Sequence, residues 1–251
     1  MKVLVAGASG LIGREVVRLL VEAGHGVRTL SQNAERAERL RALTGDVRVA
    51  DATKEGAIRG VCEGIDVVVS ALGAPVLPGA GTPRSFGDVD RVANERLLAE
   101  AAGASVRRFV YVGVYTTPAY ANTAYVRAHT EVERRIRESG LEHGFVAECV
   151  LRAVVAPGST EVELGGPETL TRRHIAELAF HAWKKAPKLV ALPVWLMRVI
   201  AWFYGIANRR VAELLAFVIP ASTTDCVATA GGTRKLGAYF EEVAARTGTA
   251  R

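Results

Sequence analysis

Apolar residues in the first 140 positions fall into short continuous runs that are separated by longer amphipathic stretches. We expect strands at the apolar runs, which are residues 2–6, 26–30, 47–50, 66–70 and 108–112. Continuous rather than alternating apolar runs are typical of parallel strands that are covered on both faces. We expect helices at the stretches between them, which are residues 12–23, 34–43, 54–63, 89–102 and 123–138. This alternation predicts an α/β fold with a doubly wound parallel sheet of the Rossmann type.

The pattern changes after about residue 140. It predicts a short strand at residues 162–164 and helices at about 171–185, 193–207, 209–219 and 234–245, the first of them capped by Thr171. We therefore expect two parts. A Rossmann domain covers residues 1–143, and a small, mostly helical C-terminal portion, residues 144–251, packs on it.

Residues 189–206 form an almost wholly apolar stretch, which raises the question of a membrane span. Arg198, near its centre, would cost about 2.5–3.5 kcal/mol at the bilayer midplane. Pro193 suits the first turn of a helix, so the helical part is shorter than the roughly 20 residues that a bilayer requires. We expect no transmembrane span, but a helix that is buried or docked on the surface of the protein.

The composition is that of a globular protein with a sizeable core, since 49% of the residues are hydrophobic and 23% are charged. The net charge is +6. The basic residues are dispersed, often next to acidic ones, and form no stripe with interleaved aromatic residues. We therefore expect no nucleic-acid partner.

The three cysteines, Cys62, Cys149 and Cys226, are widely spaced and form no Cys-x-x-Cys pair. This spacing argues against a disulfide framework or a metal site and favours a reducing compartment. The first expected strand begins at Lys2, which leaves no room for a signal peptide. We expect a cytoplasmic protein whose partner is a small-molecule substrate, and the oligomeric state stays open.

The turn after the first expected strand is rich in glycine and reads Gly7-Ala8-Ser9-Gly10-Leu11-Ile12-Gly13. With a strand before it and a helix after it, such a turn is typical of a dinucleotide site. Gly7 permits the tight turn, Gly10 lets the backbone approach a pyrophosphate, and Gly13 lets the helix pack close to the strand. The start of the helix then presents unpaired N–H groups and a partial positive charge to the phosphates.

The Gly-x-x-Gly-x-x-Gly spacing resembles the short-chain dehydrogenase/reductase superfamily in its extended and atypical branches. Residues 66–73 resemble its fourth strand and the loop beside the adenine ribose, and Asp51-Ala52 is similar to its adenine-side contact. Residues 165–171 and 193–195 resemble C-terminal features of the NAD(P)H-binding, nitrogen-metabolite-repression-regulator-like (NmrA-like) subgroup. The cofactor-binding residues that the resemblance implies are Gly7, Ser9, Gly10, Leu11, Ile12, Gly13, Ser31, Gln32, Asp51, Ala52, Ala71, Leu72 and Gly73.

The second expected strand ends in Ser31-Gln32-Asn33, without the carboxylate that would bind the 2′-hydroxyl of NAD. Ser31 and the nearby Arg36 could accommodate a 2′-phosphate. Relatives commonly carry an arginine where this chain has Ser31 or Gln32, so the strongest phosphate clamp is absent. We expect NADP(H) as the cofactor, with NAD as the alternative.

In the superfamily, a Tyr-x-x-x-Lys pair on a helix supplies the proton donor and the lysine that lowers its pKa. The corresponding residues here are Tyr125 and His129, whose spacing puts both on one face of the helix. The resemblance implies that Tyr125 protonates the acceptor and that His129 binds the nicotinamide ribose. The alternative is that both residues only line the helix. Gly113 stands where the superfamily has a serine, although Thr116 or Thr117 offers a hydroxyl nearby.

In relatives, the segment that resembles residues 138–143 leads into a sixth strand, an Arg-Pro dipeptide and a substrate loop. Here it passes at once into residues 144–150, which resemble a helix found much later in those chains. We therefore expect an internal deletion of several dozen residues after about residue 143. The sheet should then end near residues 108–112 or recruit residues 162–164, and the substrate side should be open to solvent.

Three functions are open at this point. The first is an NAD(P)H-dependent oxidoreductase that passes a hydride to a small carbonyl, enone or quinone-like acceptor. The second is a non-catalytic NADP(H)-binding redox sensor or regulator, which Gly113, His129 and the shortened pocket favour. The third is an accessory or assembly role near a membrane complex, as in the complex I accessory subunit that resembles this superfamily. The apolar stretch at residues 189–206 supports it.

Overall fold

The computed structural model describes residues 1–74, 86–146, 154, 158–162, 166–207, 209–228, 233 and 235–248. These residues form a seven-stranded sheet in the order β3-β2-β1-β4-β5-β6-β7, in which every neighbouring pair is parallel. The strands are β1 (Lys2–Ala6), β2 (Gly26–Ser31), β3 (Asp46–Val49), β4 (Val67–Ser70), β5 (Arg108–Val112), β6 (Glu142–Val146) and β7 (Thr160–Val162). The strand order reverses between β1 and β4, and doubly wound sheets bind their ligands at such a point, beyond the carboxyl ends of the strands.

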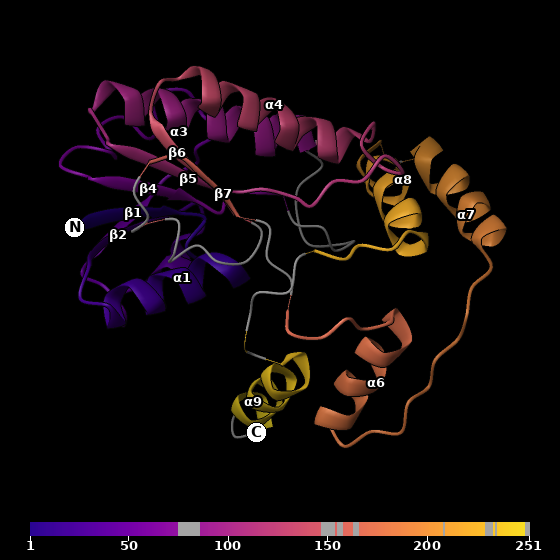
Figure 1. Ribbon diagram of the computed structural model, residues 1–251. Helices are drawn as coiled ribbons and strands as arrows, with labels where there is room; N and C mark the ends of the chain where they lie inside the picture. The colour runs from indigo at the N-terminus through magenta and orange to yellow at the C-terminus, as the bar shows by residue number, and fades with distance from the viewer. Residues whose placement is uncertain are drawn as a thin grey trace.

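Helices cover both faces of the sheet, with α1 on one face and α3 and α4 on the other (Figure 1). The helices up to β6 are α1 (Leu11–Glu22), α2 (Ala34–Glu38), the π-helical segment η1 (Gly87–Arg91), α3 (Val92–Gly103) and α4 (Ala124–Glu138). Those after β7 are α6 (Arg172–Ala182), α7 (Val194–Ala207), α8 (Arg209–Thr223) and α9 (Leu236–Gly248).

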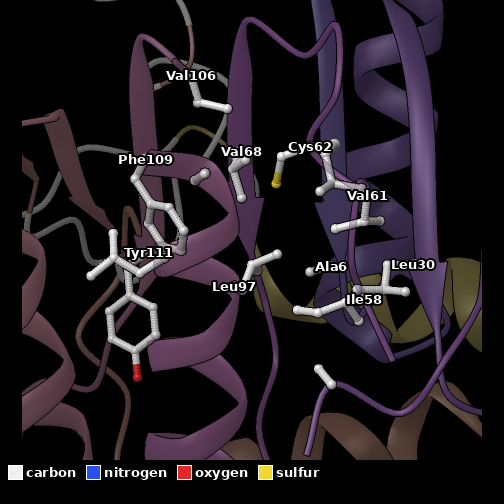
Figure 2. Close-up of a cluster of buried hydrophobic side chains, with 14 of the residues drawn as sticks. Ala6, Leu30, Ile58, Val61, Cys62, Val68, Leu97, Val106, Phe109 and Tyr111 are labelled. Carbon is white, nitrogen blue, oxygen red and sulfur yellow. The ribbon is translucent and has the colours of Figure 1, made fainter. Parts of the chain in front are cut away.

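Each face of the sheet has its own hydrophobic core, because successive residues of a strand point to opposite faces. In β1, Val3 and Val5 belong to the core under α1, whereas Leu4 and Ala6 belong to the core under α3 and α4. Figure 2 shows part of the second core, which joins side chains of β1, β4 and β5 with Leu97 of α3. Burial on both faces explains why these strands are continuous apolar runs in the sequence.

The expected Rossmann-type fold is confirmed, and the five strands expected before residue 140 are β1 to β5. The helices expected at residues 12–23, 89–102 and 123–138 are found as α1, as η1 with α3, and as α4. Thr123 caps α4, since its hydroxyl accepts a hydrogen bond from the N–H of Val126.

Two of the expected helices are wrong. Residues 54–63 form successive turns instead of a helix. Gly56 and Gly60 have φ angles of 69° and 73°, a left-handed conformation that interrupts a helix. The helix expected over residues 34–43 is only the short α2, which is followed by turns.

Of the two alternatives for the edge of the sheet, an end at β5 is wrong, and a later strand near residues 162–164 is found in part as β7. Residues 142–146 form β6, which pairs with β5 so that Phe145 lies opposite Tyr111. Residues 144–146 are therefore strand rather than helix, and residues 147–150 lie outside the described residues. β7 overlaps the expected strand at residues 162–164 only at Val162, because residues 163–165 are outside the described part as well. The boundary expected between residues 143 and 144 falls within β6.

The C-terminal portion is helical, as expected. Thr171 caps α6 by accepting a hydrogen bond from the N–H of His174 at 3.1 Å. α7 packs on α8, α6 packs on α9, and α8 also packs on α4. Figure 1 shows α6, α7 and α9 at the periphery, away from the sheet. Among the described residues, no helix is both long enough and apolar enough to cross a membrane.

Candidate functional site

The turn between β1 and α1 needs glycine at two positions for the chain to fold. Gly7 has a φ angle of 76°, and a Cβ atom on it would overlap the carbonyl oxygen of Ala71. A Cβ atom on Gly13 would overlap the carbonyl oxygen of Gly7. Gly10 differs, because a Cβ atom there would meet only the Gly7 oxygen, at 3.2 Å, and the residue is exposed. Folding therefore requires glycine less strictly at position 10 than at positions 7 and 13, and the approach of a pyrophosphate to Gly10 stays a prediction.

The start of α1 lies directly after Gly10 and is open to solvent. Leu11 is 80% exposed and Ile12 is 48% exposed, and no side-chain hydrogen bond caps the helix. The N–H groups of a first helical turn have no partner within the helix and carry its partial positive charge. The residues present therefore fit the pyrophosphate of a dinucleotide.

Polar side chains lie beside this turn, where β2 and β3 end. Ser31 donates a hydrogen bond to the hydroxyl oxygen of Ser9 at 2.8 Å. Gln32 Nε2 donates to Asp51 Oδ2, also at 2.8 Å. The structure thus brings four of the predicted cofactor residues together in two pairs. Ala52 belongs to the hydrophobic core, and its contact with adenine stays a prediction.

The loop after β4, residues 71–74, is held by two polar residues that are fully buried, Asp90 of η1 and Asn94 of α3. Asn94 Nδ2 donates to the carbonyl oxygen of Leu72 at 3.4 Å. The N–H of Ala74 lies 3.3 Å from each carboxylate oxygen of Asp90. These contacts fix the loop that carries the predicted cofactor residues 71–73 against Gly7.

His129 of α4 is buried between two polar partners and is only 5% exposed. Its Nδ1 lies 2.7 Å from the hydroxyl of Tyr111 in β5, and its Nε2 lies 3.5 Å from Asp90 Oδ1. Burial, and after it the negative charge of Asp90, raises the pKa of Tyr111 well above its usual value. His129 therefore links β5 to the loop after β4 inside the protein, and its contact with a nicotinamide ribose stays a prediction.

Tyr125 is part of an aromatic cluster between α4 and α8. Its ring centroid lies 4.9 Å from that of Phe86, 4.7 Å from that of His129 and 4.6 Å from that of Phe217. Burial and the charge of Asp90 raise the pKa of Tyr125 to about 12. The hydroxyl keeps its proton at neutral pH, so it is a weak acid here rather than one activated by a lowered pKa. Its catalytic role stays a prediction.

Gly113 directly follows β5, and its correspondence to the superfamily's serine stays a prediction. A Cβ atom on Gly113 would lie 2.7 Å from Glu133 Oε1. Burial raises the pKa of Glu133. The hydroxyl of Thr116 donates to the carbonyl oxygen of Val114 at 3.2 Å. A carboxyl group, rather than a serine hydroxyl, is thus next to this end of the strand.

An open groove of about 510 Å³ lies between the segment that follows β5 and helix α8. It is at the carboxyl side of the parallel strands, where ligands of such sheets bind. Tyr125 and His129 are not among its lining residues, although the neighbouring residues of α4 are. The groove is lined by Pro118, Ala119, Tyr120, Asn122, Thr123, Ala124, Arg127, Ala212, Glu213 and Ala216.

Sequence reasoning missed Asp90, Asn94 and Tyr111. A signal for two of them was present in the helix expected at residues 89–102. Asp90 and Asn94 are four residues apart and lie on the face that carries Leu97 and Ala101. Polar residues on a face that is buried must find hydrogen-bond partners, so such a pair indicates a buried network.

A family model described as NAD(P)H-binding matches residues 7–184, which is well over half of the chain. The chain belongs to this NAD(P)H-binding family. The match extends from the glycine-rich turn to the end of α6. The NAD(P)H-binding part of the expected resemblance is confirmed by this family match. The NmrA-like subgroup and the internal deletion stay predictions.

Two curated relatives share part of this NAD(P)H-binding chain. Photosystem II assembly factor Ycf39 of Cyanophora paradoxa is 25% identical over 149 residues, which are 59% of this chain and 45% of the factor. A 3-diazoavenalumate denitrifying reductase of a Streptomyces species is 31% identical over 192 residues, covering 66% of this chain and 60% of the reductase. The match thus spans less than two-thirds of the length of either relative.

Solved structures share the fold at low sequence identity. A nucleoside-diphosphate-sugar epimerase from Staphylococcus aureus superimposes with a TM-score of 0.71 at 15% identity, covering 96% of this chain and 100% of the epimerase. The NADPH-dependent quinone oxidoreductase QOR2 from Escherichia coli, complexed with NADPH, superimposes with a TM-score of 0.66 at 15% identity. The match covers 96% of this chain and 99% of QOR2.

Proposed function

We propose that this NAD(P)H-binding protein is an NADP(H)-dependent oxidoreductase that passes a hydride to a small carbonyl, enone or quinone-like acceptor. The observation that carries the proposal is the exposed, uncapped start of α1 behind Gly10, at the point where the strand order reverses. The reaction class, hydride transfer from a nicotinamide cofactor, is supported by the sequence similarity to a Streptomyces reductase. It is also supported by the fold shared with an NADPH-dependent quinone oxidoreductase.

The cofactor would be held by residues at the carboxyl ends of β1, β2 and β4. The N–H groups at the start of α1 would bind the pyrophosphate, and the loop at residues 71–73 would line the ribose. β2 ends in Ser31, followed by Gln32, so β2 itself carries no carboxylate that would bind the 2′-hydroxyl of NAD. The nearby carboxylate of Asp51 accepts a hydrogen bond from Gln32. Arg36 is exposed in the short helix α2, next to Glu35, and offers a guanidinium group on this side. These features favour NADP(H) over NAD.

The acceptor would reach Tyr125 from the groove between the segment after β5 and α8, which is lined by the neighbouring residues Ala124 and Arg127 of α4. Bound NADPH would supply the hydride. The hydroxyl of Tyr125, which stays protonated at neutral pH, would donate its hydrogen to the developing negative charge on the acceptor oxygen. His129 would act on the site by fixing Asp90, and through it Ala74, rather than by contact with the acceptor.

A second candidate function is a non-catalytic NADP(H)-binding protein that acts as a redox sensor or as an assembly factor. The observation that favours it is the environment of Tyr125 and His129, since one is packed among aromatic rings and the other is directed at Tyr111 and Asp90. The match to a photosystem II assembly factor supports the same candidate. A cytoplasmic location stays a prediction under either function.

Calorimetric titration with NADPH and with NADH tests the cofactor site. We expect NADPH to bind more tightly, and Gly10→Val to abolish the binding of both, because its side chain would occupy the space of the pyrophosphate. Gly45→Val is the matched control, since a Cβ atom on Gly45 meets nothing within 4 Å. Tighter binding of NADH would overturn the NADP assignment, and full affinity in Gly10→Val would overturn the site itself.

A screen for NADPH oxidation by quinones, enones and aldehydes then separates the two candidates. Turnover of at least one acceptor class, lost in Gly10→Val and kept in Gly45→Val, is the result expected for an oxidoreductase. Tight NADPH binding without turnover of any of these acceptors would favour the non-catalytic protein.

A further inference from the structure

The outer face of α7 is unusually apolar for a surface. Trp195, Trp202 and Phe203 are 66%, 64% and 62% exposed, and Val199 is 43% exposed. Trp195, Val199 and Trp202 follow one another at spacings of four and three residues, so they share one face of the helix. The helix packs on α8 with its other side. We call the exposed set, together with Arg198 at its edge, the α7 surface.

The segment before α7 extends this apolar area. Val190 is 84% exposed and Leu192 is 54% exposed. Single exposed apolar residues are normal on a protein, whereas a contiguous group with two tryptophans indicates a binding surface. At 1.5 Å per residue, the 14 residues of α7 extend about 21 Å, which is too short to span a bilayer but long enough to lie along its surface.

The stretch of chain that contains α7 carries charge of one sign only. No aspartate or glutamate occurs between Glu177 and Glu213. The basic residues in this interval are Lys184, Lys185, Lys188, Arg198, Arg209 and Arg210. The three lysines are exposed in the segment that leads to α7. Basic residues in the segment before a helix with exposed tryptophans are complementary to anionic headgroups above an apolar layer.

We propose that the α7 surface docks on an anionic lipid bilayer, with α7 in the plane of the interface. Trp195 and Trp202 would insert at the level of the headgroups, where the amphipathic indole ring is favoured. The lysines before α7 would contact lipid phosphates. A second copy of the chain fits less well, because a symmetric contact would bring two basic segments together. Lysine is also depleted in the contact surfaces between proteins.

The docking is independent of the proposed oxidoreductase function, and tryptophan fluorescence can measure it. The chain has three tryptophans: Trp195 and Trp202 are on the α7 surface, and Trp183 is at the end of α6, beside Lys184 and with its ring 6.4 Å from that of Phe240. With vesicles of phosphatidylcholine and phosphatidylglycerol, we expect a blue shift of the emission and cosedimentation of the protein. Both should weaken as salt is added and be much smaller with phosphatidylcholine alone.

Variants test whether the α7 surface causes the binding to vesicles and the blue shift. Trp195→Ala and Trp202→Ala should each lower the partition into anionic vesicles by about tenfold or more. Lys184→Gln, Lys185→Gln and Lys188→Gln should each lower it by about fivefold at low salt. Trp183→Phe is the control for the third tryptophan; it keeps an aromatic ring beside Phe240 and should partition like the unmodified protein.

Three results would overturn the proposal. One is the absence of binding to anionic vesicles, and another is equal, salt-insensitive binding to neutral ones. The third is self-association in sedimentation velocity that produces the blue shift without lipid and is lost in Trp202→Ala, because it would assign the surface to a second copy. NADPH affinity should be unchanged in all of these variants, so a failed cofactor site and a failed docking surface give different results.

Discussion

The hydroxyl of Tyr111 lies 2.7 Å from Nδ1 of His129 and so connects β5 to α4 inside the protein. The other ring nitrogen of His129 faces Asp90 at 3.5 Å, and Asp90 binds the N–H of Ala74 in the loop after β4. A chain of buried polar groups therefore runs from the middle of the sheet to the loop that lines the proposed cofactor site. Loss of one member leaves its neighbour without a partner where the dielectric constant is low.

The first prediction concerns this chain of groups. His129→Ala should lower the free energy of unfolding by about 2–4 kcal/mol, because it leaves a cavity, leaves the hydroxyl of Tyr111 without a partner and removes the 3.5 Å contact with Asp90. Tyr111→Phe removes one hydroxyl and should cost about 1–2 kcal/mol. Urea denaturation measures both, and the double variant should lose less than the sum of the two. A stable His129→Ala protein that binds NADPH weakly would instead assign His129 to the ribose.

The second prediction compares two glycines of the turn between β1 and α1. Gly7→Ala should lower the free energy of unfolding by about 1–3 kcal/mol or more, because φ is positive at Gly7 and the methyl group would overlap the Ala71 carbonyl oxygen. Gly10→Ala meets only a contact at 3.2 Å and should unfold at nearly the temperature of the unmodified protein. Thermal unfolding followed by circular dichroism checks both. Equal losses would mean that Gly10 has a folding role as well.

Local features of the sequence predicted most of the sheet. The strands β1, β4 and β5 are apolar runs because both faces are buried, and that signal is contained in a few adjacent residues. The helix predicted at residues 54–63 is wrong because the spacing of the apolar positions allows a helix, whereas the left-handed backbone at Gly56 and Gly60 interrupts it. β6 was missed because its place is decided by pairing with β5, and the pattern of residues 144–146 alone does not specify a partner strand.

The candidate site also has a part that local sequence predicts and a part that depends on contacts between distant segments. The glycine-rich turn is one contiguous segment, and the spacing of its glycines is typical of a dinucleotide site, so it could be predicted from the sequence. The link between Tyr111, His129 and Asp90 joins β5, α4 and η1, which are far apart along the chain. Helical spacing placed Tyr125 and His129 on one face, but it could not tell whether that face meets a ligand or the core.

The third prediction is a pH dependence of stability. Arg28 in β2 is buried and donates to Asp46 Oδ2 at 2.9 Å. Burial acts to raise the pKa of Asp46, but the hydrogen bond and charge of Arg28 outweigh it and hold the pKa below its usual value. A carboxylate whose pKa is lower in the folded state stabilises the fold above its unfolded-state pKa. That contribution is lost as the pH falls through the folded-state pKa.

Asp46→Asn should therefore lower the free energy of unfolding by about 1 kcal/mol at neutral pH. The difference from the unmodified protein should shrink below about pH 4, where the carboxyl group of the unfolded chain becomes protonated. Urea denaturation across this range measures it. Glu35→Gln, which changes an exposed carboxylate on α2, is the control and should leave the pH profile unchanged. A difference that persists at low pH would show that the Arg28 pairing is not electrostatic.

The last prediction separates the two candidate functions at Tyr125. Phenylalanine fits the same aromatic cluster with Phe86 and Phe217, so Tyr125→Phe should fold and bind NADPH like the unmodified protein. If the hydroxyl donates its hydrogen to the acceptor, the variant should lose about 10²–10⁴-fold in kcat with little change in the KM for NADPH, because the contact forms in the transition state. The pKa of Tyr125 is raised to about 12, so the donor stays protonated and its ionisation should not lower kcat between neutral pH and about pH 10. Stopped-flow turnover of any acceptor found in the screen measures both quantities. A kcat that survives the change to phenylalanine would remove Tyr125 from the reaction and leave it as a packing residue of α4.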